Sequence, residues 1–352
     1  MGLRLETRLA PNARWQALSV LLALLASGIV TAILLKSAGT DVWAAFTAIY
    51  DGAFGDLRAT SKSLAKSTPF ILTGLAITVA FRAKVWNIGA EGQLFAGAMS
   101  SYWLYSVTGP AMGMFLLPLL FVAGFVGGGL YGGLAGYLRS AFRVNEVLTT
   151  VMLNYVILYL LSFLLVGPWR DQSSFYQQSS RIDRSVWLPD IWAPGKLHVG
   201  FLIALVAAVV VYIIMSRSWF GYEVKAVGLN ARAARFKGIN VERTAVAVMA
   251  ISGGLAGLAG VIQVFGVNHR LETDISLGFG YTGIIIAVLA MLNPMWVVFV
   301  AILFGAFENG AIKMQVATGV PSAITSAIEA ITLLFFLTAA VLARHRIVWD
   351  SK

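Results

Sequence analysis

Residues 112–138 read MGMFLLPLLFVAGFVGGGLYGGLAGYL and contain no charged side chain. A helix needs about 20 consecutive apolar residues to cross roughly 30 Å of hydrocarbon, so this stretch is long enough to span a membrane. Gly124, Gly128, Gly132 and Gly136 recur at every fourth position, which places them on one face of such a helix. Because small residues let helices approach closely in membranes, we interpret these glycines as a packing surface.

The composition of the whole chain agrees with a membrane environment. Apolar residues make up 59% of the 352 residues, charged residues only 12%, and the mean hydropathy is +0.80. The sequence therefore predicts an all-α, polytopic integral membrane protein with one transmembrane domain over residues 1–352. We place about ten transmembrane helices at residues 15–35, 67–81, 89–107, 112–138, 147–167, 198–215, 244–265, 278–292, 295–311 and 322–343.

The distribution of basic residues predicts the sidedness of the chain. Basic residues are more numerous in the loops on the side of the two termini, so the positive-inside rule places both termini in the cytoplasm. Residues 36–66 and 168–197 are then external segments, and residues 216–243 form a cytoplasmic loop. The net charge of +10 fits a basic rim that faces anionic lipid headgroups, and it requires no nucleic acid partner.

The cytoplasmic loop contains the run GLNARAARFKGIN at residues 228–240. Asn230 is a good N-cap and Gly238 suits the left-handed position after a helix, so a helix of about two turns is predicted between them. Such a helix could be the contact through which a motor subunit moves the membrane domain; the alternative is a solvated loop that lies along the lipid surface. The predicted coupling residues are Asn230, Arg232, Ala233, Ala234, Arg235, Phe236 and Gly238.

The run VWNIGAEGQ at residues 85–93 is polar but lies between two apolar segments. Asn87 can cap the following helix and Glu91 lies in its first turn, where the helix dipole favours a negative charge. Polar groups at membrane depth are also costly unless they face a cavity or a partner, so Asn87, Glu91 and Gln93 are candidates for a substrate pathway. Both interpretations remain open from the sequence.

Other polar residues within the predicted spans are candidates for the same pathway. Asn154 lies about 12 Å into its helix, where a neutral amide can bond sugar hydroxyls or a base edge, or instead bond another helix. Thr150 is a weaker candidate, because a helical Thr usually donates its hydroxyl to its own backbone. Glu308 and Asn309 complete the set. With Glu329 and Glu91, Glu308 keeps a proton- or sodium-coupled carrier possible as an alternative.

No motif in the sequence predicts an enzyme. Residues 127–132 read GGGLYG, which has dinucleotide-binding spacing but lies within an apolar span with no preceding strand. Gly253 and Gly257 repeat the four-residue packing pattern in another span. The chain has no phosphate-binding loop, no cysteine, no metal-ligand spacing among its histidines and no catalytic triad pattern. We therefore expect no enzymatic activity, no metal and no cofactor in this chain, so any ATP with its Mg²⁺ would have to be bound by a partner.

Four runs in order resemble a known family. They are WNIGAEGQ at residues 86–93, NEVLTTVMLNY at 145–155, AVGLNARAARFKGI at 226–239 and GFGYTGIIIAVLA at 278–290. Together they resemble the permease subunits of bacterial ABC importers of the branched-chain amino acid and simple-sugar type. Within that family the runs are most similar to nucleoside permeases that work with a lipoprotein binding subunit of the basic-membrane-protein type.

The resemblance implies a function and partners. The expected function is that of a multi-pass permease subunit in a bacterial inner membrane, within an ATP-driven importer for nucleosides; a simple-sugar permease is the alternative within the family. The implied partners are an ABC ATPase, a second and related permease in a heterodimer, and an external substrate-binding lipoprotein. Which nucleoside or sugar is carried does not follow from the sequence.

Overall fold

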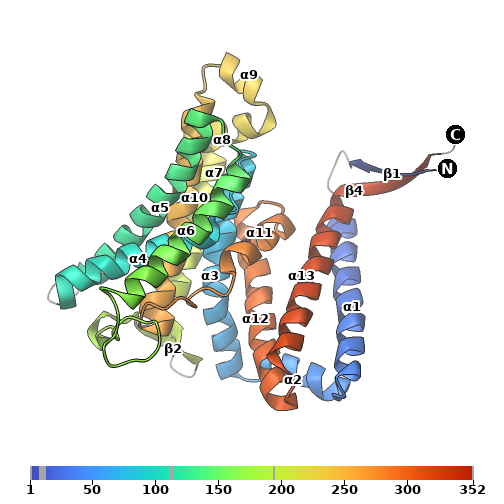
Figure 1. Cartoon of the computed structure of the whole chain (residues 1–352). Coiled ribbons are helices and arrows are strands. Elements are labelled where there is room, and N and C mark those ends of the chain that lie inside the picture. The colour runs from blue at the N-terminus through green and yellow to red at the C-terminus, as the bar shows by residue number, and fades with distance from the viewer. Residues whose placement is uncertain (1, 8–12, 111–114, 193–194, 351–352) are drawn as a thin grey trace. The chain divides into compact units, whose positions relative to one another are not determined.

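The computed structural model describes residues 2–7, 13–110, 115–192 and 195–350. The chain divides into two compact units, which are described separately (Figure 1). The large unit comprises residues 64–305, and the small unit comprises residues 1–63 and 306–352. Residues 112–114 of the predicted span and the terminal basic residues Arg8 and Lys352 lie outside the described residues.

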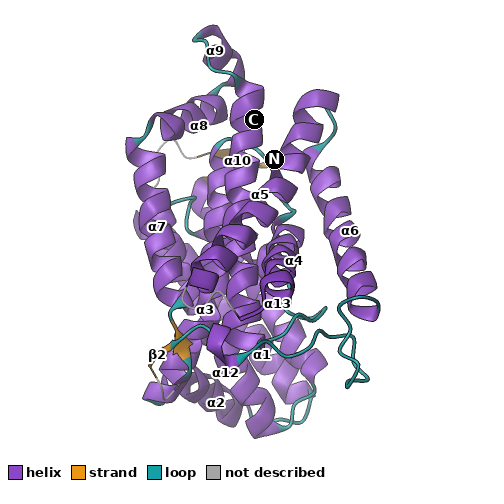
Figure 2. Cartoon of the chain, turned by 90° about the vertical axis from the view of Figure 1, so that its left-hand side faces the viewer, coloured by secondary structure: helices purple, strands orange, loops and turns teal. Residues whose placement is uncertain are grey.

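The large unit is almost entirely helical. Its elements are the main part of α3 (Leu57–Arg82), α4 (Ala90–Thr108), α5 (Leu116–Phe142), α6 (Glu146–Val166), the 3-10 turn η2 (Arg184–Val186), β2 (Asp190–Trp192), β3 (Leu197–His198), α7 (Gly200–Arg217), α8 (Trp219–Leu229), α9 (Ala231–Phe236), α10 (Val241–Ile262), the π-helical turn η4 (Gln263–Asn268), α11 (Phe279–Leu289) and the first part of α12 (Pro294–Thr318). In both views α9 lies at the opposite end of this unit from the β2–β3 hairpin (Figures 1 and 2).

Helices α4, α5 and α10 pack together as the core of the large unit. The structure places the two predicted glycine ridges against each other: a Cβ added at Gly128 would overlap the carbonyl oxygen of Gly253, and one added at Gly257 would overlap that of Gly124. A Cβ at Gly97 of α4 would likewise overlap the backbone of Gly257. The glycines therefore allow three backbones to meet at distances that no larger residue permits.

Seven helices in the described part of the chain are long and apolar enough to cross a membrane. They are α3, α5, α6, α7, α10 with η4, α12, and α13 (Ser322–Arg344) over its described side chains. All ten predicted spans coincide with helices, but α11 has only 11 residues and rises about 16 Å, which is too short to cross a bilayer. The structure therefore supports a polytopic helical fold, and the number ten stays a prediction.

The small unit contains α1 (Ala13–Ser37), α2 (Val42–Phe54), the first turns of α3, the last part of α12, α13 and two strands. Helices α1 and α13 pack side by side. The strands β1 (Gly2–Thr7) and β4 (His345–Asp350) pair antiparallel, which the sequence analysis did not anticipate. A cluster of buried apolar side chains forms the core, with Leu35, Ala48 and Met314 among its members.

The predicted external segment 36–66 is mostly helical, as its length allows. Asp41 caps α2 by accepting the backbone N–H of Trp43 at 2.9 Å. Helix α3 begins at Leu57, ten residues before the predicted start of its span at Ser67. The apolar pattern could not show this start, because Lys62 and Lys66 interrupt the hydrophobic run without breaking the helix.

Candidate functional site

A buried group of polar side chains surrounds the irregular backbone between α3 and α4. Asn87 is fully buried, and its amide exchanges two hydrogen bonds with the Gln93 amide, at 2.8 and 3.0 Å. Asn87 also donates to the Ser252 hydroxyl at 2.8 Å, and that hydroxyl donates to the carbonyl oxygen of Ala76 at 2.6 Å. The three side chains therefore tie α3, α4 and α10 together through bonds that water does not reach.

Glu91 joins the beginnings of two helices. It lies in the first turn of α4, and its carboxylate accepts the backbone N–H of Gly280 at 2.7 Å and that of Gly278 at 3.2 Å, at the start of α11. A Cβ on Gly280 would overlap the backbone of Glu91, so a glycine is needed for this approach. A negative charge between the positive ends of two helix dipoles is favourable. Glu91 is only 4% exposed.

Asn154 uses most of its hydrogen-bonding capacity on neighbouring helices. Its Nδ2 donates to the Ile88 carbonyl oxygen at 3.1 Å and to the Tyr281 hydroxyl at 3.2 Å, and its Oδ1 accepts the backbone N–H of Gly92 at 2.8 Å. Thr150 donates its hydroxyl within α6 and accepts the backbone N–H of Ile88 at 3.3 Å. An amide has two donors, so the Asn154 Nδ2 has none left for a ligand.

We refer to these side chains as the polar cluster, and its members are Asn87, Glu91, Gln93, Thr150, Asn154, Ser252 and Tyr281. The structure brings together five of the seven predicted pathway residues. Their hydrogen bonds to one another and to backbone groups hold together the helices beside the irregular backbone. Tyr281 is 43% exposed and is the member through which the cluster reaches the surface. Ser252 and Tyr281 were not predicted; Tyr281 lies in a quoted family motif, whereas nothing around Ser252 marks it.

Glu308 and Asn309, the other two predicted pathway residues, belong to the small unit. The Asn309 amide donates to the carbonyl oxygens of Gly52 and Ala59, at 2.7 and 3.1 Å, and lies 3.2 Å from the Ser63 hydroxyl. Asn309 therefore ties α12 to the turn between α2 and α3. A direct contact of either residue with substrate stays a prediction.

The predicted coupling helix is present as α9, a six-residue helix. Asn230 is its N-cap and accepts the backbone N–H of Ala233 at 3.1 Å, while Gly238 adopts a left-handed φ of +83° just after it. Phe236 is 93% exposed. Ala233, Arg232 and Gly238 are also exposed on this helix, at one end of the large unit (Figure 2).

The burial of Ala234 corrects its predicted role as a residue that contacts the partner. Its side chain is 3% exposed because it packs against Val227 and Ile239 within the chain, so it cannot fill a groove on another protein. Arg235 forms an ion pair with Glu242 at the start of α10. The surface that α9 offers to a partner is therefore centred on Phe236. The buried Ala234 side chain packs α9 against the rest of the chain.

At the end of the large unit opposite α9, residues 168–192, 195–198 and 269–278 form a folded segment. Trp187 stacks on His269 with ring centroids 3.7 Å apart and donates its indole N–H to the Ile182 carbonyl oxygen at 3.0 Å. Trp187 is half-buried and packs against other residues of this segment. The Gln178 backbone also forms an isolated β-bridge with Glu272.

His198 is buried in this segment beside the β2–β3 hairpin. It is 1% exposed, and neither ring nitrogen has a hydrogen-bond partner in the described part of the chain. Burial lowers the pKa of His198 to about 4, and burial also lowers the pKa of His269. Both effects favour the neutral ring, since a buried charge is costly.

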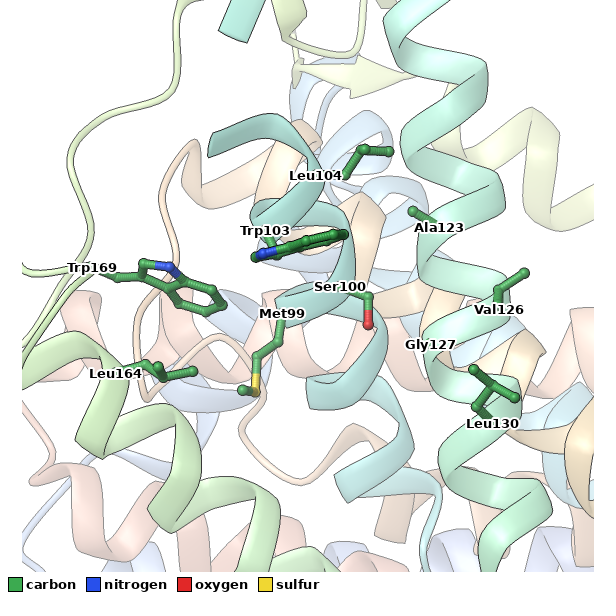
Figure 3. Close-up of a pocket in the computed structure, with 10 residues that line it drawn as sticks. All are labelled: Met99, Ser100, Trp103, Leu104, Ala123, Val126, Gly127, Leu130, Leu164 and Trp169. Carbon is green, nitrogen blue, oxygen red and sulfur yellow. The ribbon is translucent and has the colours of Figure 1, made fainter. Parts of the chain in front are cut away.

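An apolar groove of about 530 Å³ lies between α4, α5 and the end of α6 (Figure 3). Figure 3 shows Trp103 and Trp169 at one end and Val126 and Leu130 along α5. The Ser100 hydroxyl in this groove already donates to the Ala96 carbonyl oxygen at 2.7 Å. The groove therefore offers little to a hydroxyl-rich solute, and the polar cluster is the better candidate for the functional site.

The fold and these features define a multi-pass helical membrane permease. Residues 59–337 match the family described as the permease component of the branched-chain amino acid transport system, and the chain belongs to this family. No metal site is formed by His, Asp or Glu groups among the described residues.

Curated relatives are similar over most of the chain. It is 33% identical to the guanosine ABC transporter permease NupP of Bacillus subtilis over 309 residues, which covers 86% of this chain and 88% of the relative. It is 30% identical to the nucleoside ABC transporter permease NupB of Lactococcus lactis, covering 93% and 92%. A glucose ABC transporter permease of Haloferax volcanii is 33% identical, covering 81% and 77%. The chain is a permease subunit of an ABC importer and is not itself an enzyme.

Proposed function

We propose that this chain is the nucleoside-conducting permease of an ATP-driven importer in a bacterial inner membrane. The observation that carries the proposal is the similarity to permeases named for guanosine and for nucleosides over 86% and 93% of this chain. Specificity at the membrane domain would be modest, because the buried cluster satisfies most of its own donors. A binding protein outside the membrane would then select the substrate.

The proposed complex contains two different permeases. This chain is similar to both NupB and NupC, two nucleoside ABC transporter permeases of Lactococcus lactis, at 30% and 27% identity. It covers 92% of NupB but 79% of NupC, so it corresponds better to NupB. Helices α6 and α7 have exposed apolar side chains on most of their length, which a partner permease or lipid must cover.

The proposed motor contact is α9, with the termini and α9 in the cytoplasm. The exposed Phe236 ring would enter a groove on the ATPase, and Asn230 and Gly238 would fix the ends of the helix. ATP-driven closure of the ATPase would move α9 and, through α8 and α10, the helices around the polar cluster. This is a two-state mechanism in which one element is displaced as a body.

Glucose is the second candidate substrate, because the Haloferax permease is as similar in identity as the guanosine permease. Uptake of labelled guanosine and labelled glucose in cells that lack the chain, with and without the restored chain, distinguishes the two. We expect restored guanosine uptake that unlabelled adenosine or uridine reduces and glucose does not. Restored glucose uptake without guanosine uptake would reject the nucleoside proposal and leave the permease assignment intact.

A further inference from the structure

A second cavity, of about 540 Å³, lies where α3, α7 and α8 meet. Its polar lining comes from Arg82 at the end of α3, Ser216 in the last turn of α7, Ser218 between α7 and α8, and Tyr222 and Lys225 of α8. Ser216 and Ser218 donate their hydroxyls to backbone carbonyl oxygens, each at 2.6 Å. Recognition of a ligand in this cavity therefore depends on the two cations.

No acidic residue lines the cavity, and no ion pair to Arg82 or Lys225 occurs within the described residues. The Arg82 Nε donates to the Leu292 carbonyl oxygen at 2.8 Å. Its two terminal nitrogens make no hydrogen bond to the described residues. The acid on α8, Glu223, accepts the Trp219 indole N–H at 2.9 Å. A half-buried guanidinium beside an ammonium without a carboxylate favours binding of an anion.

The position of α8 indicates where the anion comes from. Trp219 and Tyr222 are 76% and 53% exposed on this helix, and such rings gather at the membrane–water interface. Their centroids are 6.2 Å apart, and Tyr222 itself lines the cavity. Met215 and Val224 form the apolar part of the wall, which suits the glycerol and upper acyl carbons of a lipid.

From this geometry we infer that the cavity binds the phosphate group of an anionic phospholipid between Arg82 and Lys225. Basic pockets between transmembrane helices are suited to such headgroups. A Cβ on Gly228 would overlap the Arg82 carbonyl oxygen, so α8 is packed closely on the end of α3. Together with this packing, the lipid would hold α8 at a fixed depth in the membrane. It would thereby also fix the position of Asn230, the N-cap of α9. This site goes beyond the transport function and does not depend on the substrate.

The test uses the purified full chain in nanodiscs of phosphatidylcholine with phosphatidylglycerol, followed by native mass spectrometry of retained lipid. Lys225→Gln is the main variant, because its side chain is exposed and the change leaves the Arg82 bond intact. Lys237→Gln removes the same charge from the α9 end and is the matched control. One cation near a membrane surface contributes about 1 kcal/mol, so we expect about a fivefold loss of retained phosphatidylglycerol in Lys225→Gln and no loss in the control.

Equal loss in both variants, or no loss in either, would overturn the inference. Inorganic phosphate added to the chain in the mixed phosphatidylcholine and phosphatidylglycerol discs separates the two sources of the anion: displacement of phosphatidylglycerol by millimolar phosphate would show that the site takes the free ion. The same variants are also extracted as the intact complex: loss of the ATPase with Lys225→Gln, while phosphatidylglycerol is retained in the discs, would assign the cations to a partner protein. Either result would reject the lipid.

Discussion

The carboxylate of Glu91 accepts the backbone N–H of Gly280, 189 positions further along the chain, at 2.7 Å. This contact joins the first turn of α4 to that of α11, and the Gly278 N–H adds a second bond at 3.2 Å. Glu91 therefore serves as a shared cap for two helix beginnings. Glu91, one of the three acids that a coupled carrier could use for ion transfer, is held by backbone donors.

Replacing Glu91 with Ala leaves the buried N–H of Gly280 and the half-buried N–H of Gly278 without their acceptor. Each such group costs about 1–3 kcal/mol, so we expect a loss of about 2–6 kcal/mol in the free energy of unfolding. Glu91→Gln keeps one acceptor oxygen and should lose roughly half as much. Thermal unfolding of the purified variants measures these two losses of stability. Full stability of Glu91→Ala with abolished uptake would instead indicate a direct role in transport.

The packing of α5 against α10 predicts that two glycines of α5 differ strongly in how well they tolerate replacement by alanine. A Cβ at Gly128 overlaps the Gly253 carbonyl oxygen, whereas a Cβ at Gly133 lies 3.5 Å from the Ala250 Cβ. Gly128→Ala should lower stability by about 1–3 kcal/mol or more, since overpacking forces the backbones apart. Gly133→Ala should be nearly neutral. Comparable yields and melting temperatures of the two variants would contradict the packing described here.

Tyr281 tests whether the exposed edge of the polar cluster contacts the solute. Tyr281→Phe removes one hydroxyl that accepts from Asn154, with a stability cost of about 1 kcal/mol. We expect an increased KM for uptake with a nearly unchanged amount of folded protein. Tyr159→Phe, on an exposed ring of α6, is the control. An unchanged KM in Tyr281→Phe would remove this residue from the pathway.

The pKa of His198 predicts that acid destabilises the β2–β3 segment. The folded pKa is about 4 and the ordinary value is 6.5, so the unfolded state binds more protons between these values. Stability therefore falls as the pH is lowered from 6.5 to about 4, by about 3 kcal/mol in total. His198→Leu should abolish this slope. Hydrogen exchange of residues around the hairpin, followed against pH, measures it; an identical slope in the variant would assign the effect to other groups.

Local patterns predicted the features that depend on neighbouring residues. Asn230 and Gly238 cap α9 because an amide acceptor and a left-handed glycine act on the nearest turn. The four-residue glycine spacing predicted a packing face because a helix repeats at nearly that interval. The partner of each face could not be predicted, since it depends on the tertiary fold.

Contacts beyond the nearest helical turn account for the differences. The burial of Ala234 depends on Val227 and Ile239, and the sequence shows only that it is small and apolar. The polar residues near α4 permitted either capping or a pathway role, and the bond from Glu91 to Gly280 needs the fold to bring the two together. Helix α11 ends at Leu289, three residues before the predicted end of its span, and Met291 and Leu292 just beyond it adopt left-handed φ values of +51° and +59°.

In the proposed mechanism, an ATPase moves this permease through the exposed face of α9. The chain is tagged, extracted gently from native membranes as wild type and as Phe236→Asp, and its stoichiometric partners are identified by mass spectrometry. We predict an ABC ATPase and a second permease with the wild type, and with Phe236→Asp the second permease alone, at unchanged stability because Phe236 is 93% exposed. A wild-type chain recovered alone, or an ATPase retained in full by Phe236→Asp, would contradict the claim.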